Sequence, residues 1–514
     1  MKRWILCLLL AAVMPLCTAC SDWDASDDPL GELSEFYRQE NNDPEPEPLT
    51  GFTLPYIAAS TLDPVQAVEP MQQTVGTLLY EGLFALDEQF RLTAVLADSW
   101  QYDSGQQTWT IRIRADAVFS DGTAVTAQDV AATLERARQS ARYGARLTHV
   151  TGISVRSGAV VLWLDEALTT LPYRLDIPIV KSGTETRTVP TGSGPYVFAQ
   201  DDDGAYLTPN THWQGGSRLP LERIELRHCK DRDSALYAFS SREIQLLALD
   251  LTDSGGSGVS GSGDYTDAPT TVMQFIGMNV HRSTLENAAL RQALSLGIDR
   301  SSLAASCLLG HGAAAQLPAS PAAADYDSSL ETPYNAAAYV QALNEALGEA
   351  REGAKPLTLT LLVNEESSFK TAAAQEVAAH LSTDRLTVTV EAVPWETFVA
   401  RLENGSFDLY YGECRLTADW DVSELVGWEG SLNYGGWASE DTQLLLTACR
   451  TAAEDGRAAA LNALWTHLLE QAPFTPVCFK SVSVLTTEGV AEGLSPTETN
   501  VFNHPENWRI HLDA

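Results

Sequence analysis

The chain has 514 residues, more than one hydrophobic core usually supports, so we expect several domains. Hydrophobic residues make up 44% and charged residues 20% of the sequence, which excludes a largely disordered chain. The 33 Lys and Arg against 68 Asp and Glu give a formal net charge of −35. This charge disfavours nucleic acid as a partner, because most of the surface repels a polyanion.

The first residues of the chain predict an export signal. A basic start is followed by the apolar run Trp4–Leu16, which is too short to cross about 30 Å of hydrocarbon as a helix. The small residues before Cys20 resemble the bacterial lipobox, which implies a lipoprotein signal peptide over residues 1–19 and lipid attachment to Cys20. An ordinary secretory signal cleaved nearby is the alternative. We therefore expect a lipid-anchored protein at the outer, extracytoplasmic face of the cell membrane.

Residues 20–49 are acidic, poor in apolar side chains and end in Pro-Glu repeats, which predicts a disordered tether between the lipid and a folded body. Beyond Cys20 the cysteines are tens of residues apart and match no zinc or redox motif, and the nine histidines are scattered. We therefore expect no metal site, no cofactor and mostly buried free thiols. These cysteines are Cys229, Cys307, Cys414, Cys449 and Cys478.

The first half of the folded body predicts an α+β arrangement. Gln107–Arg114 alternates polar and apolar residues, with Trp109, Ile111 and Ile113 on one face, which is typical of a half-buried antiparallel strand. Thr126 followed by an acid three places later predicts the start of a helix. A first strand is expected at residues 52–58, a hairpin at 153–165 with its turn at 157–158, and a flexible Gly/Ser loop at 252–266 between strands at 244–251 and 272–280.

The second half alternates strands and helices, which implies parallel strands joined by right-handed crossovers. Ligand crevices of open parallel sheets lie beyond the carboxyl ends of the strands, so the segment after the last of these strands is a candidate site. The expected strands are 357–363, 386–393 and 407–411, and the expected helices are 368–381 and 396–402, the latter ended by Gly405.

Short blocks in a fixed order, over about residues 52–510, resemble the bacterial extracellular solute-binding proteins of family 5, the oligopeptide, dipeptide and nickel class. Asp116 departs from this pattern, since the family usually has Gly there. The blocks are Thr61–Pro64, Tyr80–Leu83, Leu96–Trp100, Trp109–Arg114, Phe119–Gly122, Thr126–Val130, Gly192–Tyr196, Pro209–Trp213, Leu290–Leu294, Ile298–Arg300, Val393–Trp395, Gly405–Asp408 and Gly493–Leu494.

The resemblance implies an α/β, two-lobed periplasmic-binding-protein-like fold with an extra α+β subdomain on lobe I. Its implied boundaries are 50–272 for lobe I, with the subdomain at about 65–185, then 273–480 for lobe II and 481–514 for a return to lobe I. It also implies a monomeric substrate-binding protein that closes on a peptide and delivers it to an ABC permease in the membrane.

Polar and aromatic side chains are densest after the third strand, in a loop of lobe II. A carboxylate there would pair with a peptide ammonium, and aromatic walls would hold varied side chains. By resemblance, Asp419 is the first candidate for the amine and Asp421 the alternative, because this loop looks about two residues longer than usual and lacks the usual Pro. The expected ligand-binding residues are Asp419, Trp420, Asp421, Arg415, Trp428, Asn433 and Tyr434.

Other interpretations stay open at this point. Arg415 would bind a ligand carboxylate or neutralise Glu413 or Asp419, and the whole loop would alternatively be an aromatic-rich packing segment, with Trp428 and Trp437 in the core. The same fold would also suit a nickel chelate, haem or an oligosaccharide, or a ligand sensor without a permease. An extracellular hydrolase is disfavoured, because the sequence has neither a Gly-x-Ser-x-Gly nor a His-Glu-x-x-His motif. We therefore expect no enzyme.

Overall fold

The computed structural model describes residues 49–215, 218–254, 263–349 and 355–512. The predicted signal peptide, Cys20 and all of the predicted tether except residue 49 lie outside the described residues. In the part of the chain that is described, no helix is long and apolar enough to cross a membrane. We keep the names lobe I, subdomain and lobe II for the residue ranges predicted above; the boundaries themselves stay predictions.

A four-stranded sheet of lobe I contains the predicted first strand. β1 pairs in parallel with β10, and β9 and β8 continue the sheet as antiparallel strands. Helix α3 packs on it, and the C-terminal residue Trp508 is buried in the same core as Phe52 and Leu54. The elements are β1 Thr53–Tyr56, α3 Pro70–Leu79, β8 Tyr196–Gln200, β9 Ala205–Pro209 and β10 Ile224–His228.

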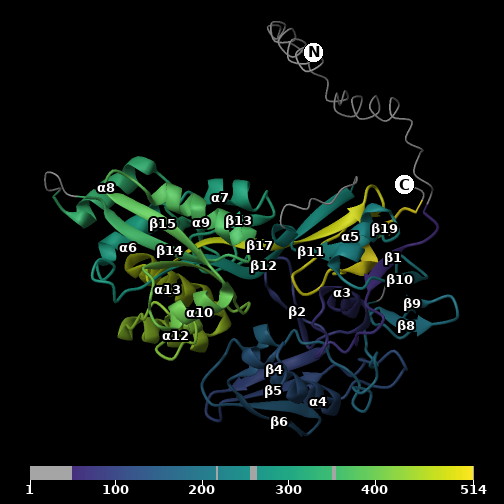
Figure 1. Cartoon of the computed structure of the whole chain (residues 1–514). Coiled ribbons are helices and arrows are strands. Elements are labelled where there is room, and N and C mark those ends of the chain that lie inside the picture. The colour runs from purple at the N-terminus through teal and green to yellow at the C-terminus, as the bar shows by residue number, and fades with distance from the viewer. Residues whose placement is uncertain (1–48, 216–217, 255–262, 350–354, 513–514) are drawn as a thin grey trace, which may run out of the picture. The chain divides into compact units, whose positions relative to one another are not determined.

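The subdomain is an antiparallel sheet covered on one face by α4, in the order β4-β5-β7-β6 (Figure 1). The alternation in β5 is confirmed, since Trp109 and Ile111 are buried. Thr126 caps α4 in a reciprocal capping box with Asp129, as predicted. The turn of the predicted hairpin is confirmed at residues 157–158, both with positive φ. The elements are β4 Ala97–Asp103, β5 Thr108–Ile113, α4 Ala127–Arg138, β6 Val150–Arg156 and β7 Ala159–Leu164.

Shorter elements complete lobe I. They are the hairpin β2 Phe84–Leu86 and β3 Leu92–Ala94, the 3-10 turn η2 Leu171–Arg174, helix α5 Arg232–Ser240, strand β11 Leu246–Leu249, and the pair β18 Ala491–Glu492 and β19 Arg509–Ile510.

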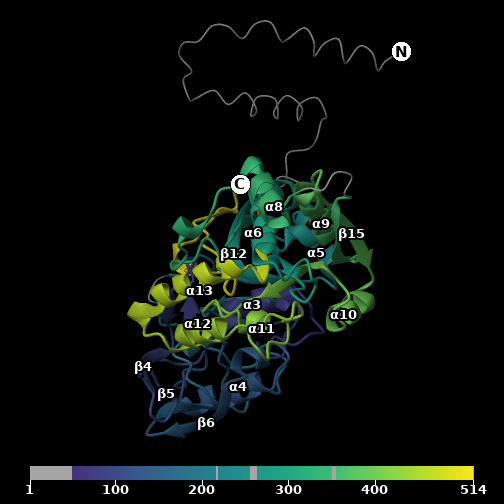
Figure 2. The same ribbon diagram turned by 90° about the vertical axis from the view of Figure 1, so that its left-hand side faces the viewer.

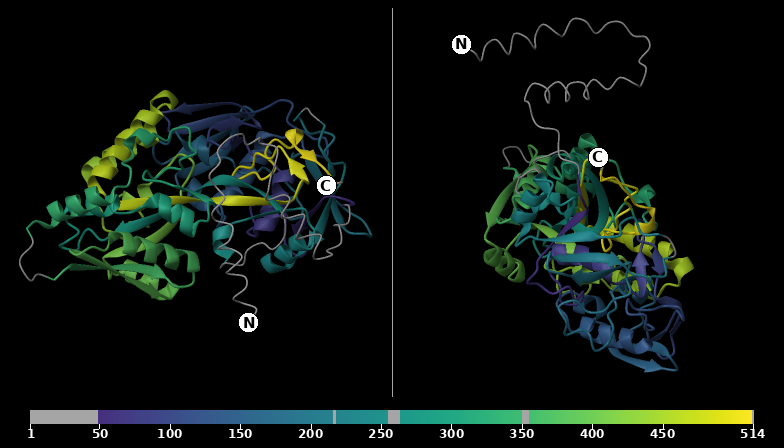
Figure 3. Two further views of the ribbon diagram at one scale, coloured as in Figure 1. Left: turned by 90° about the horizontal axis from the view of Figure 1, so that it is seen from above. Right: turned by 90° about the vertical axis from the view of Figure 1, so that its right-hand side faces the viewer.

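The largest sheet has the order β11-β17-β12-β16-β14-β15, with β13 beside β17. The predicted parallel pairing is confirmed, since β14 runs parallel to both β15 and β16. The long strands β12 and β17 lie side by side although about 200 residues separate them (Figure 3). The strands are β12 Gly263–Met278, β13 Gly312–Ala314, β14 Leu357–Asn364, β15 Leu386–Val393, β16 Leu409–Arg415 and β17 Phe474–Thr487.

Helices of lobe II pack on this sheet and on one another, with α12 against α13 (Figure 2). Helices α9 and α10 agree with the prediction, and Gly405 follows α10 with a φ of +64°. The helices are α6 Ala288–Leu296, α7 Arg300–Cys307, α8 Ala336–Leu347, α9 Ser368–Leu381, α10 Trp395–Glu403, α11 Ser423–Val426, α12 Glu440–Thr451 and α13 Arg457–Gln471.

Two expected boundaries are corrected by long-range pairing. Residues 263–266, predicted as flexible loop, begin β12, because each of them pairs with a residue of β17. The third parallel strand does not end at residue 411 but runs to Arg415, because Val272 of β12 pairs with that residue. Residues 252–254 of the predicted loop belong to a 3-10 turn that begins at Leu251, the last residue of the predicted strand, and 255–262 lie outside the described residues.

Candidate functional site

The loop after β16 buries Trp420 and Asp419, two of the side chains that were predicted to contact a ligand. Trp420 is 1% exposed, with a positive φ of 58° that places its indole between Phe90 and Phe479, at ring distances of 5.0 and 6.1 Å. Phe90 belongs to the subdomain and Phe479 to lobe II. Trp420 therefore contributes to an apolar core shared by residues of both, and its role in this structure is packing.

Asp419 lies beside Trp420 and is held by the subdomain. Its Oδ2 accepts hydrogen bonds from Thr170 Oγ1 at 2.6 Å and from Arg174 Nε and Nη2 at 2.9 and 2.8 Å. Its Oδ1 accepts from Thr417 Oγ1. Each carboxylate oxygen has about two lone-pair positions, so Oδ2 of Asp419 is filled by this protein's own groups.

Asp421 shares the same guanidinium but keeps acceptor capacity. Its Oδ2 accepts from Arg174 Nη2 at 2.8 Å, and its Oδ1 accepts from the Ser423 backbone N–H at 2.9 Å. The side chains of Arg174, Asp419 and Asp421 are 5%, 1% and 11% exposed. We call these three residues, with Thr170 and Thr417, the Arg174 cluster.

The electrostatics of the cluster follow from burial and proximity. Burial alone would raise the pKa of Asp421, but the Arg174 guanidinium and the Ser423 N–H outweigh it, so the pKa lies below its usual range. Burial alone would lower the pKa of Arg174, but the two carboxylates hold it above its ordinary value. Arg174 and Asp421 are therefore both charged at neutral pH.

Neighbouring contacts join the same two regions. Thr169 donates its backbone N–H to the Arg450 carbonyl at 2.8 Å and its hydroxyl to the Ala452 carbonyl at 2.7 Å. The Tyr173 hydroxyl donates to Glu454 at 2.8 Å, and the Arg457 guanidinium lies 4.2 Å from the Tyr173 ring centre. The segment that leads into Arg174 is thus tied to lobe II through Thr169 and Tyr173.

Sequence reasoning missed Arg174, although a signal for it existed. The residue stands in the largely apolar stretch 167–180, where its neighbours Leu171, Leu175 and Ile177 are buried. A cation in such a stretch has to find a buried counter-charge, because an unpaired buried charge is costly. The partner itself lies 245 residues away and no local pattern indicates it.

The other predicted residues divide between packing and exposure. Arg415 forms an ion pair with Glu498, not with Glu413 or Asp419. Asn433 binds the backbone of Gly427 and Trp437, and Tyr434 packs edge-on against Tyr410 at 6.2 Å. Trp428 is 63% exposed and so remains available for a contact with another molecule.

A second buried group of charges lies where β12 and β17 run together. Lys480 is 5% exposed and reaches Asp250 of lobe I at 3.0 Å and Glu413 of β16 at 3.2 Å. Glu413 also pairs with Lys370 at 3.1 Å and accepts from Gln274 Nε2 at 2.7 Å. We call these residues the Lys480 cluster.

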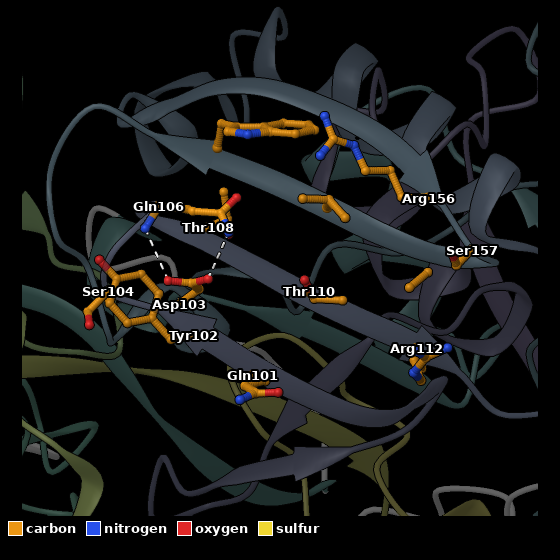
Figure 4. A pocket seen from close by; sticks show the side chains of 13 residues that line it. Gln101, Tyr102, Asp103, Ser104, Gln106, Thr108, Thr110, Arg112, Arg156 and Ser157 are labelled. Carbon is orange, nitrogen blue, oxygen red and sulfur yellow. Dashed lines mark hydrogen bonds between the residues drawn. The ribbon is translucent and has the colours of Figure 1, made fainter.

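A groove of about 530 Å³ lies on the subdomain sheet, away from every predicted site residue (Figure 4). Arg156 stacks on Trp163 there at 4.6 Å, and Asp103 is occupied by the turn residues Gly105 and Gln106. The groove is open and polar, and none of its residues belongs to the Arg174 cluster. Within the described residues, no group of three or more His, Cys, Asp or Glu is arranged to hold a metal ion, and the five cysteines are free.

The fold is that of the two-lobed α/β proteins with an extra subdomain. Residues 91–430 match the bacterial extracellular solute-binding proteins, family 5 (middle region), and the chain belongs to this family. The members of this family are bacterial extracellular solute-binding proteins.

Individual relatives are more distant. The chain is 27% identical over 305 residues to the glutathione-binding protein GsiB of Escherichia coli strain K12, covering 56% of this chain and 59% of that protein. The chain thus spans less than two thirds of the length of the curated relatives it matches.

Two solved structures share the fold. The periplasmic murein tripeptide binding protein MppA, in its unliganded open form, has a TM-score of 0.75 at 20% identity and covers 91% of this chain and 99% of its own. The oligopeptide-binding protein AppA of Bacillus subtilis, in complex with a nonapeptide, has a TM-score of 0.60 at 19% identity and covers 91% and 100%.

Proposed function

We propose that this protein is the substrate-binding lipoprotein of an ABC importer, which captures peptides between its lobes and delivers them to a membrane permease. Cys20 is its lipid attachment site, and the protein acts as a monomer at the outer face of the cell membrane. AppA, an oligopeptide-binding protein solved with a nonapeptide, and MppA, a murein tripeptide binding protein, support peptide as cargo. GsiB, a glutathione-binding relative, supports a short peptide-like ligand.

The observation that carries the proposal is the paired carboxylates of Asp419 and Asp421, which are buried at the contact between subdomain and lobe II. One guanidinium does not balance two carboxylates, so the cluster retains a net negative charge in a poorly solvated place. A peptide ammonium supplies the missing positive charge and donates the charge-assisted hydrogen bonds that carboxylates accept best. Asp419 and Asp421 form the amine site in this proposal, and Trp428 supplies an exposed aromatic contact.

Native mass spectrometry of the purified protein tests the cargo directly. A co-purified peptide mass supports the proposal, whereas the mass of a nickel chelate, haem or an oligosaccharide supports the same fold with another ligand. Calorimetry with a tripeptide pool then measures the affinity, and Asp419→Ala is the matched variant. Neighbouring genes for a permease and an ATPase distinguish an importer from a sensor without a permease.

A further inference from the structure

The amine site of the proposed function is already occupied by a cation of the protein itself. Arg174 donates two hydrogen bonds to Asp419 and one to Asp421, at 2.8–2.9 Å. With the bond from Thr170, Oδ2 of Asp419 accepts three hydrogen bonds and has no position left for a ligand ammonium, whereas Oδ1 accepts one bond, from Thr417. A ligand amine can bind Oδ2 of Asp419 only if Arg174 gives up at least one of its bonds.

Among the residues that the structure describes, no other nearby cation forms an ion pair with Asp419 or Asp421. Arg146 is paired with Asp176, and Arg457 is paired with Asp325 at 2.6 Å while also donating to the Ala418 carbonyl. Both of these guanidinium groups are therefore engaged by carboxylates outside the cluster. In the described part of the chain, Arg174 is thus the one cation that pairs with both Asp419 and Asp421.

We propose that Arg174 is a specificity-determining residue, an internal cation that competes with the ligand ammonium for Asp419 and Asp421. The inference rests on the proposed function, since it takes those carboxylates as the amine site. A free amino terminus must compete with a guanidinium that is already in place and that makes three hydrogen bonds. A peptide with a blocked amino terminus does not compete with Arg174, because it has no ammonium group to pair with the carboxylates.

The competition is coupled to the contact between regions. Arg174 ends η2 in the subdomain, whereas both carboxylates lie on the lobe II loop after β16. A ligand amine that displaces Arg174 therefore replaces a bond between subdomain and lobe II with a bond between ligand and lobe II. Only ligands whose further contacts with the protein offset the lost bonds of Arg174 are expected to bind tightly. An ammonium group without such contacts is not sufficient.

The test measures the affinity of a tripeptide pool with free amino termini and of the same pool after N-acetylation. Arg174→Gln removes the competing charge and keeps a polar side chain of similar reach. We expect it to bind the free-amine pool at least tenfold more tightly than the wild type, with the acetylated pool unchanged. Arg174→Lys keeps the positive charge but loses the planar guanidinium with its several N–H donors. We expect its affinity for the free-amine pool to stay within threefold of that of the wild type.

A second variant keeps the test decisive if Arg174→Gln fails to fold. Arg174→Gln leaves two carboxylates without a cation, whereas Arg174→Gln with Asp421→Asn leaves a single carboxylate and the net charge of the wild-type cluster. This double variant is expected to bind the free-amine pool at least as tightly as the wild type. If the single variant does not unfold cooperatively on heating, the affinity of the double variant tests whether Arg174 competes with the ligand, and weaker binding than that of the wild type contradicts the proposal.

The outcomes separate the two proposals. If the wild type binds peptides and the folded Arg174→Gln variant binds the free-amine pool no more tightly, or more weakly, only the role of Arg174 is overturned. If no folded form, the wild type included, binds either pool, then peptide capture itself is wrong and the role of Arg174 falls with it.

Discussion

The two buried charge clusters of this protein differ in charge balance and in solvation. In the Arg174 cluster, one guanidinium faces two carboxylates, and the three side chains are 1–11% exposed. In the Lys480 cluster, Lys480 and Lys370 face Asp250 and Glu413, and both carboxylates are 29% exposed. Both clusters join residues of lobe I to residues of lobe II.

This difference indicates different roles. When a charged partner is removed, carboxylates that contact water lose little stabilisation, because water still solvates them. In the Lys480 cluster, the two carboxylates also lie beside two ammonium groups. Such a cluster is suited to holding adjacent strands together. A dry cluster with excess negative charge is poised to respond to a further cation, because burial magnifies the interaction. The Arg174 cluster is therefore the one we expect to sense a ligand.

The largest effect on stability is expected from Arg174→Ala. It leaves Asp419 and Asp421 buried side by side without a cation, and breaking a buried ion pair typically costs about 3–5 kcal/mol. Urea denaturation at pH 7 measures the change in free energy of unfolding. A loss below 1 kcal/mol would show that the cluster is better hydrated than its exposure indicates.

Asp419→Ala is expected to cost less stability but more binding. Arg174 keeps Asp421 as a partner, so we expect a loss of about 1–3 kcal/mol from the hydrogen bonds that disappear. Peptide affinity is expected to fall tenfold or more, because Arg174 then engages the one remaining carboxylate. Calorimetry with a peptide pool measures this, and unchanged affinity contradicts the assignment.

Thr170→Val is the matched control for that variant. It removes one hydrogen bond to Asp419 Oδ2 and leaves every charge of the cluster in place. Its peptide affinity is expected to stay within about threefold of the wild type, so a large loss only in Asp419→Ala assigns the effect to the carboxylate.

Lys480→Met tests the other half of the comparison. The substitution keeps the length of the side chain, Glu413 retains Lys370, and both carboxylates are accessible to water. We expect a loss of about 1–2 kcal/mol in urea denaturation, discounted for solvent screening, with no change in peptide affinity. A loss as large as that of Arg174→Ala would erase the distinction between the clusters.

Both clusters are expected to make the stability of the protein depend on pH in the acidic range. The pKa of Asp421 is lowered in the folded protein, so the unfolded state binds more protons once the pH falls below about 4. The stability that Asp421 contributes is present above the unfolded pKa and is lost as the pH falls through the folded pKa. Glu413 behaves likewise, since burial raises its pKa but Lys480 and Lys370 lower it further.

The measurement compares thermal unfolding between pH 5 and pH 2.5 for the wild type, Asp421→Asn and Glu413→Gln. Each variant is expected to lose less stability than the wild type over this range, because it lacks one titrating carboxylate. A wild-type slope retained in Asp421→Asn would mean that the carboxylate is not stabilised by Arg174.

Local patterns were sufficient for the α/β part of the fold. The helix at residues 368–381 and the strand at 386–393 have the predicted bounds, because periodicity and a capping Ser367 specify them within a few residues. The start of β12 was missed, because only the pairing of residues 263–266 with β17 makes a Gly-rich segment extended. Sequence periodicity carries no information on such a partner.

The candidate site was predictable only in part, for the same reason. The loop with Asp419 and Asp421 was found from its composition and from the family resemblance. Its counter-ion Arg174 belongs to another region of the fold, and the burial of Trp420 depends on Phe90, which is even farther away in the sequence. The residue types therefore located the acidic loop, whereas the counter-ion that pairs with its carboxylates is determined by the fold.

The smallest effect on stability is expected from Trp428→Ala, which makes it the cleanest probe of ligand contact. The indole is 63% exposed, so its removal is expected to change the free energy of unfolding by about 0.5 kcal/mol or less. Trp395→Ala is the matched control, because Trp395 is 53% exposed on the same lobe but outside the candidate segment. A several-fold loss of peptide affinity in Trp428→Ala alone assigns that indole to the ligand. Equal affinities in both variants would confine recognition to the carboxylate pair, and the Arg174 cluster would then account for ligand selection without an aromatic wall.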